Sequence, residues 1–180
     1  MFGLNLVVHK GKTIFVGDTS VNEYPNAKQL SEIAISAARV VKLFGFDPRI
    51  AFVSHSTFGQ PLTSRTKHIK EAVEILKDKK VNFKFDGDMQ PDVALDEEYK
   101  SLYPFSDIVG NANVLIMPGQ HSAAISYKMM KSFGDSKVIG PLLIGLGLPI
   151  EIAPLRSSTS EILNLASIAA YSADIIDYKK

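Results

Sequence analysis

Two loops rich in serine and threonine carry residue types suited to binding an anion. The first, Ser54-His-Ser-Thr-Phe-Gly59, joins an expected strand to an expected helix. The unpaired backbone N–H groups and the dipole of a helix N-terminus favour a negative charge. The same hydroxyl groups could instead cap turns, and from the sequence both interpretations stay open. The loop lacks the Gly-Lys-Ser/Thr ending of a P-loop, which argues against nucleotide triphosphate hydrolysis.

The second loop is Arg156-Ser-Ser-Thr-Ser-Glu161. Ser158 and Glu161 have the spacing of a capping box, which predicts that Ser158 is the N-cap of a helix. Arg156 precedes that N-terminus, where its guanidinium group could form paired hydrogen bonds with a phosphate. A surface arginine without a ligand is the alternative. A third loop, Pro118–His121, follows another expected strand.

The carboxylates and histidines do not show the spacing of a metal site. Three aspartates lie within Asp86–Asp92, but the segment does not match an EF-hand loop, and Asp92 after Pro91 is a natural helix N-cap. The histidines at positions 9, 55, 68 and 121 have no paired ligand spacing, and no Gly-x-Ser-x-Gly elbow occurs. His55 and His121 fall at strand ends, where either could touch a ligand. We therefore expect no metal in this chain.

Composition narrows the function classes. The chain has 180 residues with a net charge of +1, so no overall field attracts nucleic acid or an anionic membrane. It contains no cysteine, which excludes disulfides and thiolate nucleophiles. The N-terminus lacks the pattern of a signal peptide, and the apolar run Val138–Ile152 is broken by glycine, proline and glutamate. We expect a soluble, cytoplasmic protein.

Strands alternate with helices of about a dozen residues, which predicts an α/β fold with a mostly parallel sheet flanked by helices. The expected strands are Leu4–Val8, Thr13–Val16, Arg49–Ser54, Val81–Phe85, Val114–Met117 and Ile150–Ala153. The expected helices run from the N-cap Asn26 to Gly45 and over Arg65–Lys77, Asp92–Tyr99, Ser122–Phe133 and Ser158–Tyr171. His9–Lys12 should form a hairpin turn, and Asp86–Pro91 a loop. In such folds ligands bind beyond the carboxyl ends of the strands.

Several ordered segments resemble the phosphate acetyl/butyryl transferase family. They are Ser54-His-Ser-Thr-Phe-Gly59, Asp86-Gly-Asp-Met-Gln-Pro-Asp-Val-Ala94, Gly110-Asn-Ala-Asn-Val-Leu-Ile-Met-Pro118, Tyr127-Lys128 and Gly140-Pro-Leu-Leu-Ile-Gly-Leu-Gly-Leu-Pro149. The resemblance covers roughly residues 50–170 in the family's order. It implies a phosphotransacetylase-like fold, with an architecture like that of isocitrate and isopropylmalate dehydrogenases.

The chain departs from the family pattern where the family's chemistry takes place. The family's Asp-Leu-Ser-Arg loop reads Ala153-Pro-Leu-Arg156 here, so Leu155 replaces the serine while Arg156 is retained. The aspartate that accepts the proton of the coenzyme A thiol in the family falls at Ile162. Isoleucine cannot accept a proton, and leucine has no hydroxyl to donate. The resemblance therefore implies no catalytic residues in this chain.

The opening Thr13-Ile-Phe-Val-Gly-Asp-Thr-Ser-Val-Asn-Glu-Tyr-Pro25 resembles one branch of the family, the phosphotransacetylase-like domain fused behind bacterial malic enzymes. This resemblance implies that residues 1–180 are the C-terminal portion of such a module within a longer malic enzyme. Met1 is then a fragment start, and Phe2–Thr19 enters the domain in mid-fold. NADP and a divalent metal are expected only in the malic-enzyme domain.

The leading hypothesis is a non-catalytic regulatory and oligomerisation module. Acetyl-CoA or a related acyl-CoA would bind as an effector where the Ser54–Gly59, Pro118–His121 and Leu155–Ser158 loops converge. The expected effector-binding residues are Arg156, Ser54, Ser56, Thr57, Gly59, Gln120, Ser157 and Ser158. Its expected partners are further copies of itself, in a dimer or larger homo-oligomer, and the malic-enzyme domain of the same chain, with no nucleic acid or membrane. An active phosphate acetyltransferase using His55 or His121, and a purely structural domain, are the alternatives.

Overall fold

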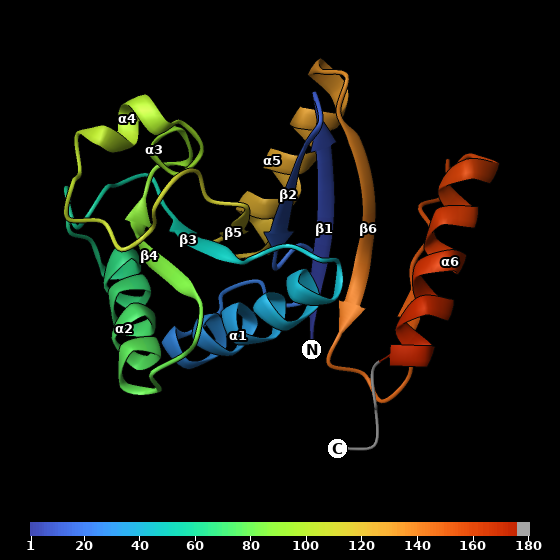
Figure 1. Cartoon of the computed structure of the whole chain (residues 1–180), viewed down its shortest axis with the longest axis horizontal. Helices are drawn as coiled ribbons and strands as arrows, with labels where there is room; N and C mark the ends of the chain where they lie inside the picture. Colours follow the sequence, from blue (N-terminus) through green and yellow to red (C-terminus); the bar gives the residue numbers. More distant parts are fainter. Residues whose placement is uncertain (176–180) are drawn as a thin grey trace.

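A computed structural model describes residues 1–175 of the chain as a seven-stranded mixed sheet with helices packed on it (Figure 1). The strands are β1 (Phe2–His9), β2 (Lys12–Gly17), β3 (Arg49–Val53), β4 (Lys84–Met89), β5 (Val114–Ile116), β6 (Lys137–Ile144) and β7 (Ile150–Glu151). Their order across the sheet is β4-β3-β5-β2-β1-β6-β7. The expected α/β class is confirmed. The last five residues of the expected module, 176–180, lie outside the described part.

The pairing pattern divides the sheet into two parts. Strands β4, β3, β5 and β2 pair in parallel, whereas β1 pairs antiparallel with both β2 and β6, and β7 pairs antiparallel with β6. Five strands therefore share one direction, and β1 and β7 run against them. The predicted hairpin is confirmed as β1 and β2, and its turn uses positive φ angles at Lys10 and Gly11.

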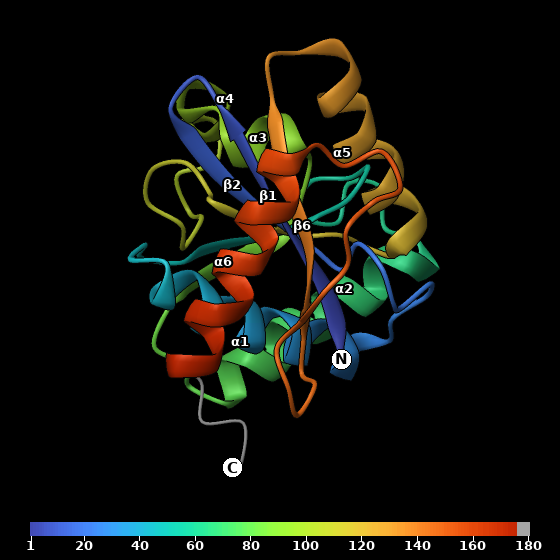
Figure 2. The same ribbon diagram turned by 90° about the vertical axis from the view of Figure 1, so that its right-hand side faces the viewer.

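The helices cover both faces of the sheet. They are α1 (Ala27–Leu43), α2 (Ser64–Asp78), α3 (Pro91–Leu95), α4 (Glu97–Ser101), α5 (Gln120–Phe133) and α6 (Thr159–Ile175). Helices α1 and α2 contribute to the hydrophobic core on one face, while α3 and α5 contribute to that on the other. Helix α6 stands beside β6 at the edge of the sheet (Figures 1 and 2). Within the described residues, no helix is long and apolar enough to cross a bilayer.

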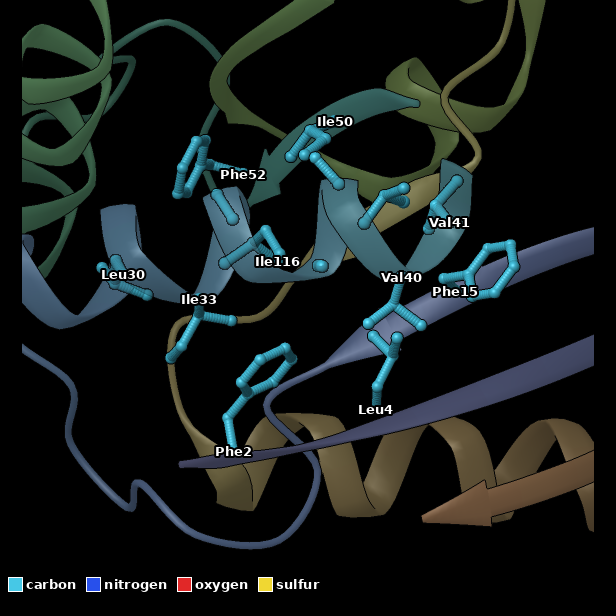
Figure 3. Packing of buried hydrophobic residues seen from close by; sticks show 14 of the residues in the cluster. Phe2, Leu4, Phe15, Leu30, Ile33, Val40, Val41, Ile50, Phe52 and Ile116 are labelled. Atoms are coloured by element: carbon cyan, nitrogen blue, oxygen red, sulfur yellow. The ribbon is translucent and has the colours of Figure 1, made fainter. Parts of the chain in front are cut away.

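The larger core lies between α1 and the sheet. Figure 3 shows Ile33 and Val40 of α1 facing Phe2, Leu4 and Phe15 of the hairpin. These side chains are almost completely buried. Helix α1 begins where the sequence predicts, because the side chain of Asn26 caps it and forms a capping box with Gln29. The core therefore packs α1 against the hairpin, which continues the sheet beside the parallel strand β5.

Two strand predictions are wrong. The fourth strand spans Lys84–Met89 rather than Val81–Phe85, so most of the segment expected as a loop belongs to the sheet. Polar residues are tolerated there because Asp86 accepts from the backbone N–H of Asp107 and Asp88 accepts from the Ser56 hydroxyl. Strand β6 was not predicted, because its glycine and proline read as chain breakers. It is nevertheless held by β1 on one side and β7 on the other.

Two helix predictions need a smaller correction. The expected helix Asp92–Tyr99 is two short helices, α3 and α4, separated at Asp96, whose side chain caps α4. Asp92 is not an N-cap: Gln90 occupies that position, Pro91 takes the first helical position, and Asp92 lies in the first turn. A proline is well tolerated there because its missing N–H would have no helical partner.

Candidate functional site

A cleft of about 610 Å³ opens at the carboxyl ends of β3, β4 and β5. These strands are parallel, so the loops that follow them meet at one edge of the sheet. His55 follows β3, Pro91 follows β4, and Pro118 and His121 follow β5. The lining residues are Glu23, Tyr24, Val53, Ser54, His55, Ile69, Pro91, Met117, Pro118, Gly119, His121, Ser122, Ile125 and Ser126. The Ser54–Gly59 and Pro118–His121 loops therefore both contribute residues to this cleft.

Within the first loop, Ser54 is the expected site residue that reaches the cleft. Its hydroxyl lies 3.4 Å from Nδ1 of the exposed His55 and 3.3 Å from the Ser56 hydroxyl. Ser56 is fully buried and donates to the carboxylate of Asp88 in β4. A short line of hydrogen-bonding groups thus runs from the buried Asp88 to the imidazole in the cleft, and it fixes the position of Ser54.

Thr57 and Gly59 support this loop from outside the cleft. The Thr57 hydroxyl accepts from the backbone N–H of Gln90, and the Gly59 N–H donates to Asp88. Phe58 and Gly59 both have positive φ angles, which turn the chain sharply away from β3. Gly59 lines a different pocket, beside α2. The Ser56 and Thr57 hydroxyls are therefore engaged by Asp88 of β4 and by Gln90 just after it, so they fasten the loop to the end of β4.

The opposite wall of the cleft, Glu23 and Tyr24, was not identified from the sequence. The backbone just before this wall is held in place by the side chain of Asp18, which is 1% exposed. Its Oδ1 accepts from the backbone N–H groups of Gly3, Ser20 and Val21, and its Oδ2 accepts from both nitrogens of Asn22. The spacing Asp18-x-x-x-Asn22 after a strand was the available signal, because it is typical of a side chain that caps successive backbone amides.

Helix α5 points its N-terminus at the cleft. Its N-cap is Gly119, which has no side chain to satisfy the first backbone N–H groups. A Cβ at Gly119 would lie 2.4 Å from the carbonyl oxygen of Glu23, so only glycine permits this approach. The Gln120 N–H donates to the Asn22 carbonyl, which ties the helix to the opposite wall. The side chain of Gln120 lines a neighbouring pocket that shares His121 with the cleft.

The remaining expected residues lie elsewhere. Arg156, Ser157 and Ser158 are not among the residues that line the cleft, so the three predicted loops do not converge on one site. Strand β7 runs antiparallel to β6, so its carboxyl end points away from the edge at which β3 and β5 end. The predicted capping box is confirmed, since Ser158 and Glu161 exchange hydrogen bonds at the start of α6. The departures from the family pattern, Leu155 and Ile162, are both exposed.

Two carboxylates, Glu161 in the first turn of α6 and Glu151 in β7, have shifted pKa values. The Ser158 backbone N–H, followed by the Lys131 ammonium group, lowers the pKa of Glu161 to about 2. Lys131 lies 3.1 Å from Glu161 and links α5 to α6. Burial raises the pKa of Glu151 in β7 to about 7, although a hydrogen bond from the Leu143 backbone opposes the shift. Glu161 therefore remains charged at neutral pH, whereas Glu151 titrates there.

Chemically, the cleft combines donors for an anion with an apolar floor. Backbone N–H groups at the start of α5 and the Ser54 hydroxyl can donate, and Ile69 and Met117 supply apolar surface to the cleft. Its volume falls in the range of about 300–1,000 Å³ that is typical of small-molecule sites. In the described part of the chain, no three His, Asp or Glu side chains are grouped to hold a metal ion.

In sequence comparison, residues 1–170 match the family described as Phosphate acetyl/butaryl transferase. An NADP-dependent malic enzyme of Rhizobium meliloti is 44% identical over 173 residues, covering 96% of this chain and 23% of the malic enzyme. A phosphate acetyltransferase of Bacillus subtilis is 32% identical over 169 residues, covering 93% of this chain and 52% of that protein. The chain thus spans about a quarter of one relative and half of the other.

Structural comparison agrees with the sequence. A crystal structure of a phosphotransacetylase from Streptococcus pyogenes matches with a TM-score of 0.90 and 32% identity. The match covers 96% of this chain and 54% of that one. The expected phosphotransacetylase-like fold is confirmed.

Proposed function

The chain belongs to the phosphate acetyl/butaryl transferase family, and on that premise we propose that it is a regulatory and assembly module that binds acetyl-CoA or a related acyl-CoA without transferring the acyl group. The observation that carries the proposal is a formed cleft at the carboxyl edge of the sheet, combined with apolar residues where the family carries a hydroxyl donor and a proton acceptor. The cleft supports binding. The substitutions at Leu155 and Ile162 argue against catalysis.

Binding would rest on the cleft formed by the first and third loops. The phosphates of the acyl-CoA would lie at the N-terminus of α5, beside His55 and His121. The apolar floor would contact the less polar part of the ligand. Arg156 is exposed and does not line this cleft, so it could contact the ligand only if the ligand extends towards α6.

Isothermal titration of the whole chain with acetyl-CoA tests the proposal. We expect saturable binding that weakens about tenfold in His121→Ala, because a donor beside the phosphates is lost. His9→Ala is the matched control, since His9 lies at the hairpin turn and contacts Ser136. Absence of binding at millimolar acetyl-CoA, or equal affinity in both variants, would overturn the proposal.

A second candidate, phosphate acetyl transfer, is favoured by one observation: His55 and His121 line the same cleft and could exchange protons with a ligand. The assay measures acetyl phosphate formed from acetyl-CoA and inorganic phosphate. Turnover that is abolished by His55→Ala or His121→Ala would establish this activity and displace the non-catalytic proposal.

We propose further that the module self-associates in the cytoplasm and serves a malic-enzyme domain on the same chain. The malic-enzyme partner is supported by relatives described as NADP-dependent malic enzymes, of which this chain matches less than a quarter. Self-association is supported by an exposed apolar stripe on α5, formed by Ile125, Met129 and Phe133. An acyl-CoA with unequal affinity for two assembly states would shift the attached enzyme between them. Sedimentation analysis with and without acetyl-CoA measures this shift, and an unchanged monomer would refute it.

A further inference from the structure

A small, mostly apolar cavity that contains a few polar groups lies apart from the cleft, near β1 and β6 and between α5 and α6. Its volume is about 60 Å³. Asn5 of β1 and Ser157 of the loop before α6 contribute polar atoms, and Val138 and Leu165 contribute apolar surface. Tyr127 and Lys131 of α5 also line it. Neither Leu155 nor Arg156 belongs to the lining.

Two buried polar groups at this cavity lack partners. Asn5 is completely buried, and its Oδ1 accepts from the Thr19 hydroxyl at 2.5 Å, but its Nδ2 has no hydrogen-bond partner among the residues that the structure describes. The buried Oγ of Ser157 is likewise unpaired within the described residues. A buried donor that makes no hydrogen bond destabilises the folded state, so such groups in a folded protein call for an explanation.

The backbone fixes the direction of the Asn5 side chain. Leu4 and Leu6 on either side of it join the core beneath α1, and Val7 joins the core on the other face. Side chains alternate along a strand, so Asn5 shares the face of Val7 and is directed towards α5. The Nδ2 donor therefore faces the cavity rather than the α1 core.

The charges around the cavity favour a negatively charged acceptor. Lys131 lies at its wall, and Ser157 immediately precedes the N-terminus of α6, the positive end of that helix dipole. Glu161 also lines the cavity and pairs with Lys131 at 3.1 Å, so these two charges cancel and the N-terminus of α6 supplies the remaining positive potential. Each carboxylate oxygen of a ligand would then have one donor, Asn5 Nδ2 or Ser157 Oγ.

We propose that this cavity binds a short-chain carboxylate of formate to acetate size. One water molecule needs about 10–15 Å³, so the cavity has room for roughly four water-sized groups. Acetate has the same number of heavy atoms. Phosphate esters and coenzyme A are too large. The methyl group of acetate would contact Val138 and Leu165. This site is independent of the acyl-CoA proposal, because it shares no lining residue with the cleft.

Occupancy would fasten α6 to the rest of the domain. Leu165 is the α6 side chain counted among the nearly fully buried core residues, and the Lys131–Glu161 pair and a hydrogen bond from Tyr171 to the Leu43 carbonyl add polar contacts. A carboxylate joined to both Asn5 and Ser157 would bridge β1 to the start of α6. The bound state should therefore slow amide hydrogen exchange along α6.

The test is a titration of the whole ¹⁵N-labelled chain with sodium acetate, which follows the side-chain amide of Asn5 by NMR. We expect a saturable shift of that amide and slower hydrogen exchange in α6. Ser157→Ala should weaken binding about three- to tenfold, as loss of one hydrogen bond predicts. Ser167→Ala is the matched control, because its hydroxyl bonds to the Leu163 carbonyl within α6 and is exposed. It should bind acetate like the parent chain.

Three outcomes would overturn the proposal. The first is an absence of saturable response to acetate, which would leave water as the partner of Asn5. The second is an equal shift with sodium chloride at the same concentration, which would indicate an adventitious ion only. The third is unchanged affinity in Ser157→Ala. His121→Ala should retain acetate binding, so failure of the acyl-CoA proposal and failure of this one can be told apart.

Discussion

Substituting Glu151 by glutamine should abolish a pH dependence of stability that the fold imposes. Glu151 lies in β7 with its Oε2 unpaired among the described residues, and burial raises its pKa from 4.5 to about 7. The folded state therefore holds the proton more tightly than the unfolded state. The free energy of unfolding should fall as the pH rises from 4.5 through 7, and the contribution is fully present only below 4.5.

The size of the effect follows from the shift. At about 1.4 kcal/mol per pH unit, a rise from 4.5 to about 7 sets a ceiling of about 3 kcal/mol. Because the side chain is only partly buried, water screens much of this penalty, and we expect about 1 kcal/mol. For a chain of this length that corresponds to a change of about 2–4 °C in Tm.

The assay is urea unfolding of the parent chain and Glu151→Gln between pH 4 and pH 8. Protonated glutamate and glutamine are alike, so the two proteins should agree at pH 4 and the variant should be more stable at pH 8. Glu71→Gln is the control, an exposed carboxylate that pairs with Lys67 across one turn of α2 at 3.9 Å. A constant difference between parent and Glu151→Gln across this range would refute the reasoning.

Three further substitutions test how the cleft and α6 are held. Asp18→Asn should lower the free energy of unfolding by about 2–4 kcal/mol in urea titrations, since a buried charge with five N–H donors is removed. Gly119→Ala should lower the free energy of unfolding by about 1–3 kcal/mol and weaken acetyl-CoA binding, because the new Cβ meets the Glu23 carbonyl. Its control is Gly147→Ala, which has open space around the Cβ and should change neither stability nor binding. Lys131→Met should leave the free energy of unfolding nearly unchanged in urea titrations, because the ion pair is partly exposed, yet speed hydrogen exchange in α6.

Sequence patterns predicted the β1–β2 hairpin, β3, β5 and α1 well, because each signal there is local. The run that forms β3 is apolar and short, and Asn26 begins α1 with its own side chain. Strand β4 was misplaced because Asp86 and Asp88 look like loop residues until their partners are known. Those partners, Asp107 and Ser56, lie far away in the sequence. Local propensity cannot include such contacts.

The candidate site was likewise predicted only in part. The parts that were missed depend on contacts between residues far apart in the sequence. The loops holding Ser54 and His121 follow parallel neighbours, so their convergence follows from topology alone. The wall formed by Glu23 depends on the hydrogen bonds of Asp18 and on the missing side chain of Gly119, which no periodicity records. Arg156 was expected beside the other loops because the direction of β7 was not known.

The contrast between α1 and α6 bears on what the module does. Nine residues of α1 are buried, whereas Leu165 alone is fully buried among the described side chains of α6, although α6 is the more apolar helix. A helix that is apolar on most sides is normally buried. Its exposed face, with Ile162 and Leu163, therefore favours contact with further protein. The residue that replaces the family's proton acceptor lies on that face, so the same substitution that argues against acid–base catalysis also adds apolar contact surface.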